Sequence, residues 1–151
     1  MVRVLSLLVL AVMAGSAAQP GGHATCMGGT IASIRSGTSG QLVTDAPNAF
    51  LFVASSTTVT IPYNKINMLE YGQDVGRRVL LAWAVSPVFL LMKARAHYLT
   101  VGFIDADDHQ QTLVFRLDKR IVRSTLATLE ARSGRNRTYQ DPDARKSHRG
   151  G

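Results

Sequence analysis

Three carboxylates and a histidine stand together at Asp105, Asp107, Asp108 and His109, where they could in principle ligate a cation. An EF-hand loop needs further oxygen ligands and a glycine at fixed positions, and neither follows here. Clustered Asp residues between two β-like segments are typical of a tight, solvated turn. The sequence therefore predicts a hairpin turn at this point and no metal site.

Other patterns that carry chemistry are missing from the chain. The four histidines are scattered, and none stands in an HExxH spacing. There is no G-x-S-x-G motif around a serine, and the glycine pair at 28–29 is not followed by the Lys and Ser or Thr of a phosphate loop. The sequence predicts a protein that is not an enzyme and that uses no cofactor.

The most informative segment is an apolar run at residues 79–92, VLLAWAVSPVFLLM, with basic residues on both sides. A helix of that length is about 21 Å long, whereas the hydrocarbon core of a bilayer is about 30 Å thick, so the run is too short to span. Pro87 disfavours helix at the preceding residue, which predicts a bend or two short arms. Trp83 suits a membrane interface, because its ring is apolar and its N–H is polar.

Three interpretations of this run stay open: it dips into one membrane leaflet, it packs on its own domain as core, or it docks a partner protein or a second copy. The basic flanks and the lack of a polar stripe favour the membrane. The runner-up is a protein-interaction or self-association module. The residues expected to make the contact are Arg77, Arg78, Leu80, Leu81, Trp83, Val85, Pro87, Val88, Phe89, Leu90, Leu91, Lys93 and Arg95.

The N-terminus predicts export. A basic start, an apolar stretch at 4–13 and small residues at 14–18 form a cleavable signal peptide over residues 1–18. The net charge of +7 and pI of about 10.2 favour anionic partners, and export points to lipid or an envelope protein rather than nucleic acid. Cys26 is the only cysteine, so no intrachain disulfide forms, and we expect a free thiol in a flexible leader.

The remaining chain predicts one mainly β (α+β) domain over residues 30–134, preceded by a linker at 19–29 and followed by a disordered basic tail at 135–151. The domain is expected to be a small antiparallel barrel or sandwich, with an apolar helical or hairpin insertion at 76–96. About seven short strands are indicated by alternation and turn signals, at 30–35, 41–44, 49–54, 57–61, 66–73, 98–105 and 111–117.

One helix should close an end of this barrel. Apolar residues recur at i, i+4 and i+7 from Val122, which predicts an amphipathic helix over 119–133. Asp118 stands where an N-cap is expected, and Gly134 stands just past the end.

Strands followed by one C-terminal helix resemble the PH-like and GRAM-like superfold, most specifically through VTIPYNKINMLE at residues 59–70. The chain is also similar to small uncharacterised exported bacterial proteins with an apolar insertion, through LEYG at 69–72, HYLTVGF at 97–103 and LEARSG at 129–134. Asp108 stands where that group has a turn glycine. The resemblance implies a fold and a setting in the bacterial periplasm or cell envelope, and it implies no activity.

Overall fold

The computed structural model describes residues 22–73, 96–139 and 145. Eight strands form one sheet in the order β4-β3-β2-β1-β7-β6-β5-β8. The elements are β1 (Gly22–Gly29), β2 (Thr38–Val43), β3 (Ala49–Ala54), β4 (Thr58–Pro62), the 3-10 turn η1 (Tyr63–Lys65), β5 (Ile66–Gly72), β6 (His97–Ile104), β7 (Gln110–Leu117), α2 (Val122–Ser133) and β8 (Thr138–Tyr139).

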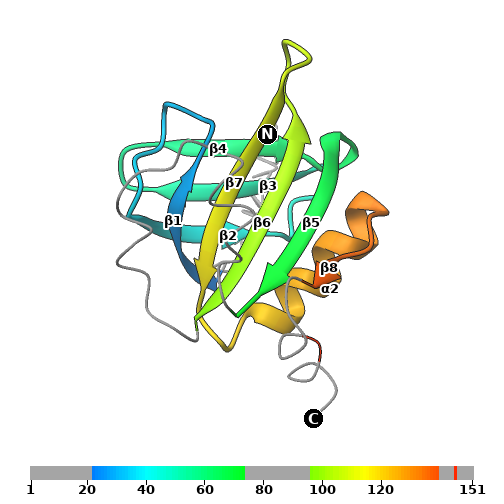
Figure 1. Ribbon diagram of the computed structural model, residues 1–151. Helices are drawn as coiled ribbons and strands as arrows, with labels where there is room; N and C mark the ends of the chain where they lie inside the picture. The colour runs from blue at the N-terminus through cyan, green and yellow to red at the C-terminus, as the bar shows by residue number, and fades with distance from the viewer. Residues whose placement is uncertain (1–21, 74–95, 140–144, 146–151) are drawn as a thin grey trace, which may run out of the picture.

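The sheet folds into two halves whose strands cross steeply, with β2, β3 and β4 behind β5, β6 and β7 (Figure 1). Strand β1 pairs with both β2 and β7 and joins the halves, and its pairing with β7 shifts register between Cys26 and Gly28. The predicted mainly β domain with one C-terminal helix is confirmed. Of the two predicted forms, an antiparallel barrel or sandwich, the barrel is not observed, because the sheet is not closed, and the sheet is mixed because the short β8 pairs with β5 in parallel.

Aromatic side chains fill the space between the two halves. Strand β3 alternates so that Phe50 and Phe52 point inward, and both are fully buried. Their rings meet Phe115 of β7 at centroid distances of 5.8 Å and 5.1 Å. Three aromatic rings from opposite halves therefore tie the crossed strands to one core.

The turn after β4 positions the helix. Pro62 ends the strand, and the buried Tyr63 begins η1. The Tyr63 hydroxyl donates to the carbonyl oxygen of Thr44 at 2.8 Å, and the Arg132 guanidinium lies 5.6 Å from the centre of the Tyr63 ring. Arg132 also donates to the carbonyl oxygen of Ala46 at 2.7 Å. The segments 59–70 and 129–134, which carry the resemblance, therefore meet in space and hold α2 against η1.

Helix α2 begins three residues later than the sequence predicts. Asp118 is not its N-cap: the Asp118 carboxylate accepts from the backbone N–H of Arg120 at 3.0 Å, within the turn that precedes the helix. The predicted apolar face is confirmed, with Val122, Leu126 and Leu129 buried. Gly134 ends the helix as predicted, in the left-handed conformation at φ 68°.

The predicted linker at 19–29 is wrong over residues 22–29, which form β1 and enter the core. Glycine serves close approach here rather than flexibility: a Cβ on Gly29 would lie 2.2 Å from the Thr112 carbonyl oxygen, and one on Gly22 would lie 2.1 Å from the Ile121 side chain. Cys26 is fully buried, and burial raises the pKa of its thiol. It is therefore a core residue and no part of a flexible leader.

Residues 30–35 were expected to form a strand and instead form turns. The amide of Ile34 donates to the carbonyl oxygen of Ile31 at 3.4 Å, and both side chains turn towards the core. The predicted tail also begins with structure. Arg135 donates from Nε to the carbonyl oxygen of Ile66 at 3.3 Å, and Thr138 then pairs with Glu70 of β5.

Candidate functional site

The predicted insertion has a single stem. Strands β5 and β6 are antiparallel neighbours, and Gly72 at the end of β5 is paired with Tyr98 near the start of β6 (Figure 1). The chain therefore leaves and re-enters the sheet at one point. Every residue predicted to contact a membrane or partner, from Arg77 to Arg95, lies in 74–95, outside the residues that the structure describes.

Three aromatic side chains gather at this stem, and we call Tyr71, His97 and Tyr139 the stem cluster. The Tyr71 hydroxyl lies 2.6 Å from Nδ1 of His97, and the two rings stack at 6.1 Å between centroids. Tyr139 of β8 meets Tyr71 edge-on at 6.4 Å. The two strand ends that carry the insertion are thereby held together by side chains as well as by backbone pairing.

A partly buried ion pair holds Tyr139 in place. Arg137 Nη2 lies 3.0 Å from Glu130 Oε2, with side-chain exposures of 12% and 23%. The backbone amide of Arg137 donates to Glu130 Oε1 at 2.8 Å, and the guanidinium lies 5.7 Å from the centre of the Tyr139 ring. Helix α2 thus positions β8, and β8 supports the stem cluster.

Acid should weaken the domain through His97. Burial, with a smaller effect from Lys119, lowers the pKa of His97 below 6.5, and Asp118 opposes this shift. A histidine with a depressed folded pKa stabilises the fold above the unfolded value, and this contribution is lost as pH falls through about 6.5 towards the folded pKa. We therefore expect the melting temperature to fall more between about pH 7.5 and about pH 5.5 in wild type than in His97→Gln.

The control for this measurement is His109→Gln, which removes an exposed histidine away from the stem. It should keep the wild-type loss of stability on acidification. An equal loss in His97→Gln and wild type would show that other groups carry the acid sensitivity.

A second, smaller apolar cluster lies beside the stem, on the face of the sheet away from the main core. It consists of the buried side chains of Met27, Tyr98 and Val114, with Ala96 packed against them. These residues come from β1, β6 and β7, and they alternate with inward-facing neighbours along each strand. Apolar side chains thus pack on both faces of the sheet near the point where the insertion begins.

In the acidic turn between β6 and β7, the Asp105 carboxylate accepts hydrogen bonds from neighbouring residues of the same hairpin. Ligand atoms of Asp105, Asp107 and His109 lie within 4.8 Å of one another. However, Asp105 accepts from the amides of Asp107 and His109 at 2.9 Å and 2.8 Å, and from the Gln111 side chain at 2.6 Å. Asp108 takes a φ of 60°, the conformation for which glycine was expected. These hydrogen bonds and this backbone conformation explain the cluster of acidic residues as part of a hairpin turn.

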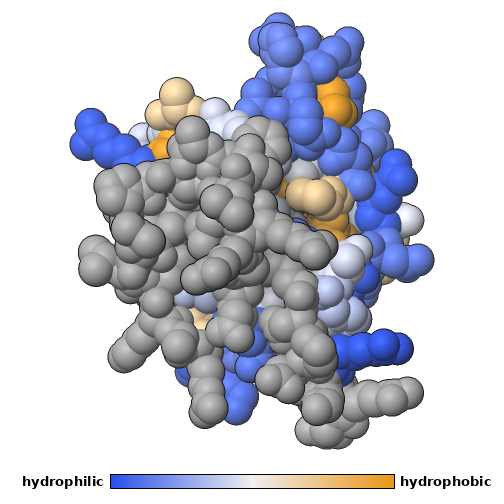
Figure 2. Space-filling model, in the orientation of Figure 1, coloured by the Kyte–Doolittle hydropathy of each residue, from blue (hydrophilic) through white to orange (hydrophobic). Residues whose placement is uncertain are grey.

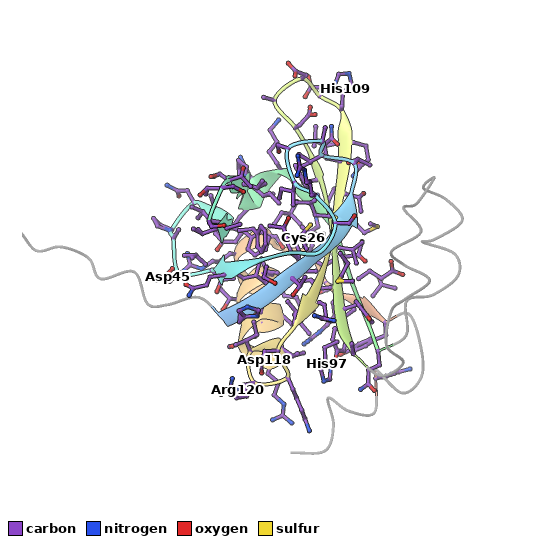
Figure 3. The ribbon with its side chains drawn as sticks, turned by 90° about the vertical axis from the view of Figure 1, so that its left-hand side faces the viewer. Cys26, Asp45, His97, His109, Asp118 and Arg120 are labelled. Atoms are coloured by element: carbon purple, nitrogen blue, oxygen red, sulfur yellow. The ribbon has the colours of Figure 1, made fainter. Side chains whose placement is uncertain are left out.

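The turn also lies far from the stem. It forms a projecting tip covered mainly by hydrophilic residues (Figure 2). His109 at the tip and His97 at the stem lie at opposite ends of the molecule (Figure 3). The sequence singled out the acidic turn and missed the stem cluster. The tyrosine and histidine of that cluster stand in LEYG and HYLT, but only strand pairing shows that they meet.

Within the described residues, no helix has the length and apolar character needed to cross a bilayer. The chain was compared with protein-family models and with curated proteins, and none of either matches it.

Proposed function

We propose that this protein is a non-catalytic, exported component of the bacterial cell envelope whose β domain holds an apolar insertion against a membrane surface. The observation that carries the proposal is the single stem between β5 and β6, where Gly72 and Tyr98 are register partners. A segment anchored at one point can enter a leaflet as a unit while the domain remains outside. The apolar run at 79–92 and its basic flanks supply the chemistry.

Transfer of apolar side chains into the membrane would contribute most of the binding free energy, and attraction between basic residues and anionic lipid would contribute less. The run carries Trp83, Phe89 and four leucines, and burying one large apolar side chain is worth roughly 1.5–3 kcal/mol. Each basic residue near an anionic surface adds about 1 kcal/mol. Four bases flank the run, so binding should be stronger on anionic vesicles than on neutral ones.

We further propose that the domain is PH-like. Seven antiparallel strands in two crossed halves, followed by one C-terminal helix, support this assignment. The meeting of Tyr63 and Arg132 adds a structural role for the IPY and LEAR segments. The assignment concerns the scaffold, and the membrane role rests on the insertion.

Vesicle co-sedimentation tests the membrane role. The chain from Gln19 onward should pellet with anionic vesicles, and a variant with Trp83, Phe89 and Leu90 each changed to Ser should stay in the supernatant while keeping its circular dichroism spectrum. The matched control is Val53→Ser with Met68→Ser, which removes the large exposed apolar side chains of the described sheet, and it should pellet like wild type. Wild-type protein that stays in the supernatant as a monomer would refute the proposal, and soluble oligomers would indicate a docking module.

A further inference from the structure

An open pocket lies beside the stem, at the end of the sheet opposite the acidic turn. It has a volume of about 430 Å³. The start of β1, the start of β6, the end of β7 and the turn after it contribute its walls, and His97 and Asp118 lie at this end in Figure 3. Its lining residues are His23, Thr25, Ala96, His97, Arg116, Leu117, Asp118 and Lys119.

The pocket has more positive than negative groups. Arg116 and Lys119 line it and are exposed, and within the described residues neither makes a hydrogen bond or an ion pair. The carboxylate among the described lining residues, Asp118, is already engaged, because Arg120 donates to it from Nε and Nη2, both at 3.2 Å. Hydrogen bonds from Arg120 lower the pKa of Asp118 to about 2, so this carboxylate is ionised at neutral pH and has Arg120 as its partner. Among the residues that the structure describes, no carboxylate pairs with Arg116 or Lys119.

Two histidines add further hydrogen-bond donors to the same pocket. Nδ1 of His97 faces the Tyr71 hydroxyl at 2.6 Å. When that hydroxyl donates to Nδ1, the ring proton sits on Nε2, which is then the donor available to a ligand. His23 brings a second imidazole, and the Thr25 side chain brings a hydroxyl. Guanidinium, ammonium, imidazole and hydroxyl groups around one cavity are the donor set that binds phosphate.

We propose that this pocket binds a phosphate-type oxyanion, through Arg116 and Lys119 with His23 and His97 as further donors. The anion is either a free phosphate or the phosphate of a lipid headgroup. The pocket adjoins the stem, so a lipid headgroup could reach it only if the insertion binds a membrane, and this version of the proposal rests on the proposed function. Binding of free phosphate does not depend on that function. A bound headgroup would set the orientation of the domain on the membrane that the insertion enters.

Titration with inorganic phosphate, followed by NMR of the histidine rings, tests the site. We expect saturable shifts of the His97 and His23 resonances in wild type. Arg116→Gln with Lys119→Gln should bind phosphate about tenfold or more weakly, since charge-assisted hydrogen bonds are lost. The matched control, Lys65→Gln with Arg123→Gln, removes the same charge from exposed positions outside the pocket and should bind like wild type.

Two further experiments show whether the anion comes from a lipid headgroup or from free phosphate. They also show whether a negative result contradicts the phosphate pocket or the membrane role. Vesicles of phosphatidylcholine with phosphatidylglycerol should reproduce the ring shifts and displace phosphate if a headgroup is the ligand, and should leave them unchanged if the ligand is free phosphate. The Trp83, Phe89 and Leu90 serine variant should still bind inorganic phosphate even where vesicle binding is lost. If neither phosphate nor vesicles cause saturable shifts, the proposal that this pocket binds an oxyanion is refuted. It is also refuted if the control variant binds phosphate as weakly as the Arg116 and Lys119 variant, whatever the result of vesicle co-sedimentation.

Discussion

Replacement of residues 74–96 by Asn-Gly is expected to give a folded domain that no longer binds vesicles. Gly72 and Tyr98 are register partners, so residues 73 and 97 lie opposite each other at the next position of the antiparallel ladder. A two-residue Asn-Gly loop suits that connection, because a type I′ turn follows the twist of the strands. The Tyr71–His97 contact is retained, so the stem itself should stay closed.

The measurements are thermal melting, size-exclusion chromatography and vesicle co-sedimentation. We expect a monomer with a cooperative melt close to that of wild type and no protein in the vesicle pellet. The alternative in which 79–92 is core makes the opposite prediction, because removing core side chains costs several kcal/mol. A variant that aggregates or melts without cooperativity would therefore favour the core interpretation and contradict the membrane anchor.

Phe115→Ala is expected to lower the free energy of unfolding by about 3–5 kcal/mol. Phe115 is fully buried on β7, opposite Cys26 of β1 and Leu99 of β6. Its ring also meets Phe50 and Phe52 from the other half of the sheet. Alanine would leave a cavity where the two halves meet, and small domains are stable by only about 5–15 kcal/mol.

Urea denaturation measures this effect. The control is Val53→Ala on β3, whose side chain is 39% exposed, and it should change stability by no more than about 0.5 kcal/mol. A loss below about 1 kcal/mol in Phe115→Ala would mean that the halves are not coupled through this ring.

Local patterns predicted much of the fold. Residues 49–54 alternate aromatic and smaller side chains and form β3 with the predicted bounds. The buried face of α2 follows from helical spacing, which acts within a few residues. Interactions of this range can be deduced from the sequence alone.

The errors arose where distant contacts decide the structure. Strand β1 contains three glycines, a composition that predicts a linker, although Gly22 and Gly29 in fact leave room for Ile121 and Thr112 to pack against them. The stem cluster unites residues 71, 97 and 139, and no spacing along the chain predicts that meeting. For the same reason, no sequence pattern indicated that the side chains of His23, Arg116 and Lys119 line one pocket.

The short segment after α2 has a consequence for solubility. An exposed edge strand offers unpaired N–H and C=O groups to any other strand and so invites aggregation. Arg135 covers the Ile66 carbonyl and Thr138 and Tyr139 pair with Glu70 and Tyr71, so residues 135–139 shield the outer side of β5. At the opposite edge, β4 is short and ends in Pro62, which cannot donate to a neighbour. Among the described residues, the open sheet thus ends in a two-residue strand on one side and in a short strand closed by proline on the other, and both features disfavour edge-to-edge pairing with another chain.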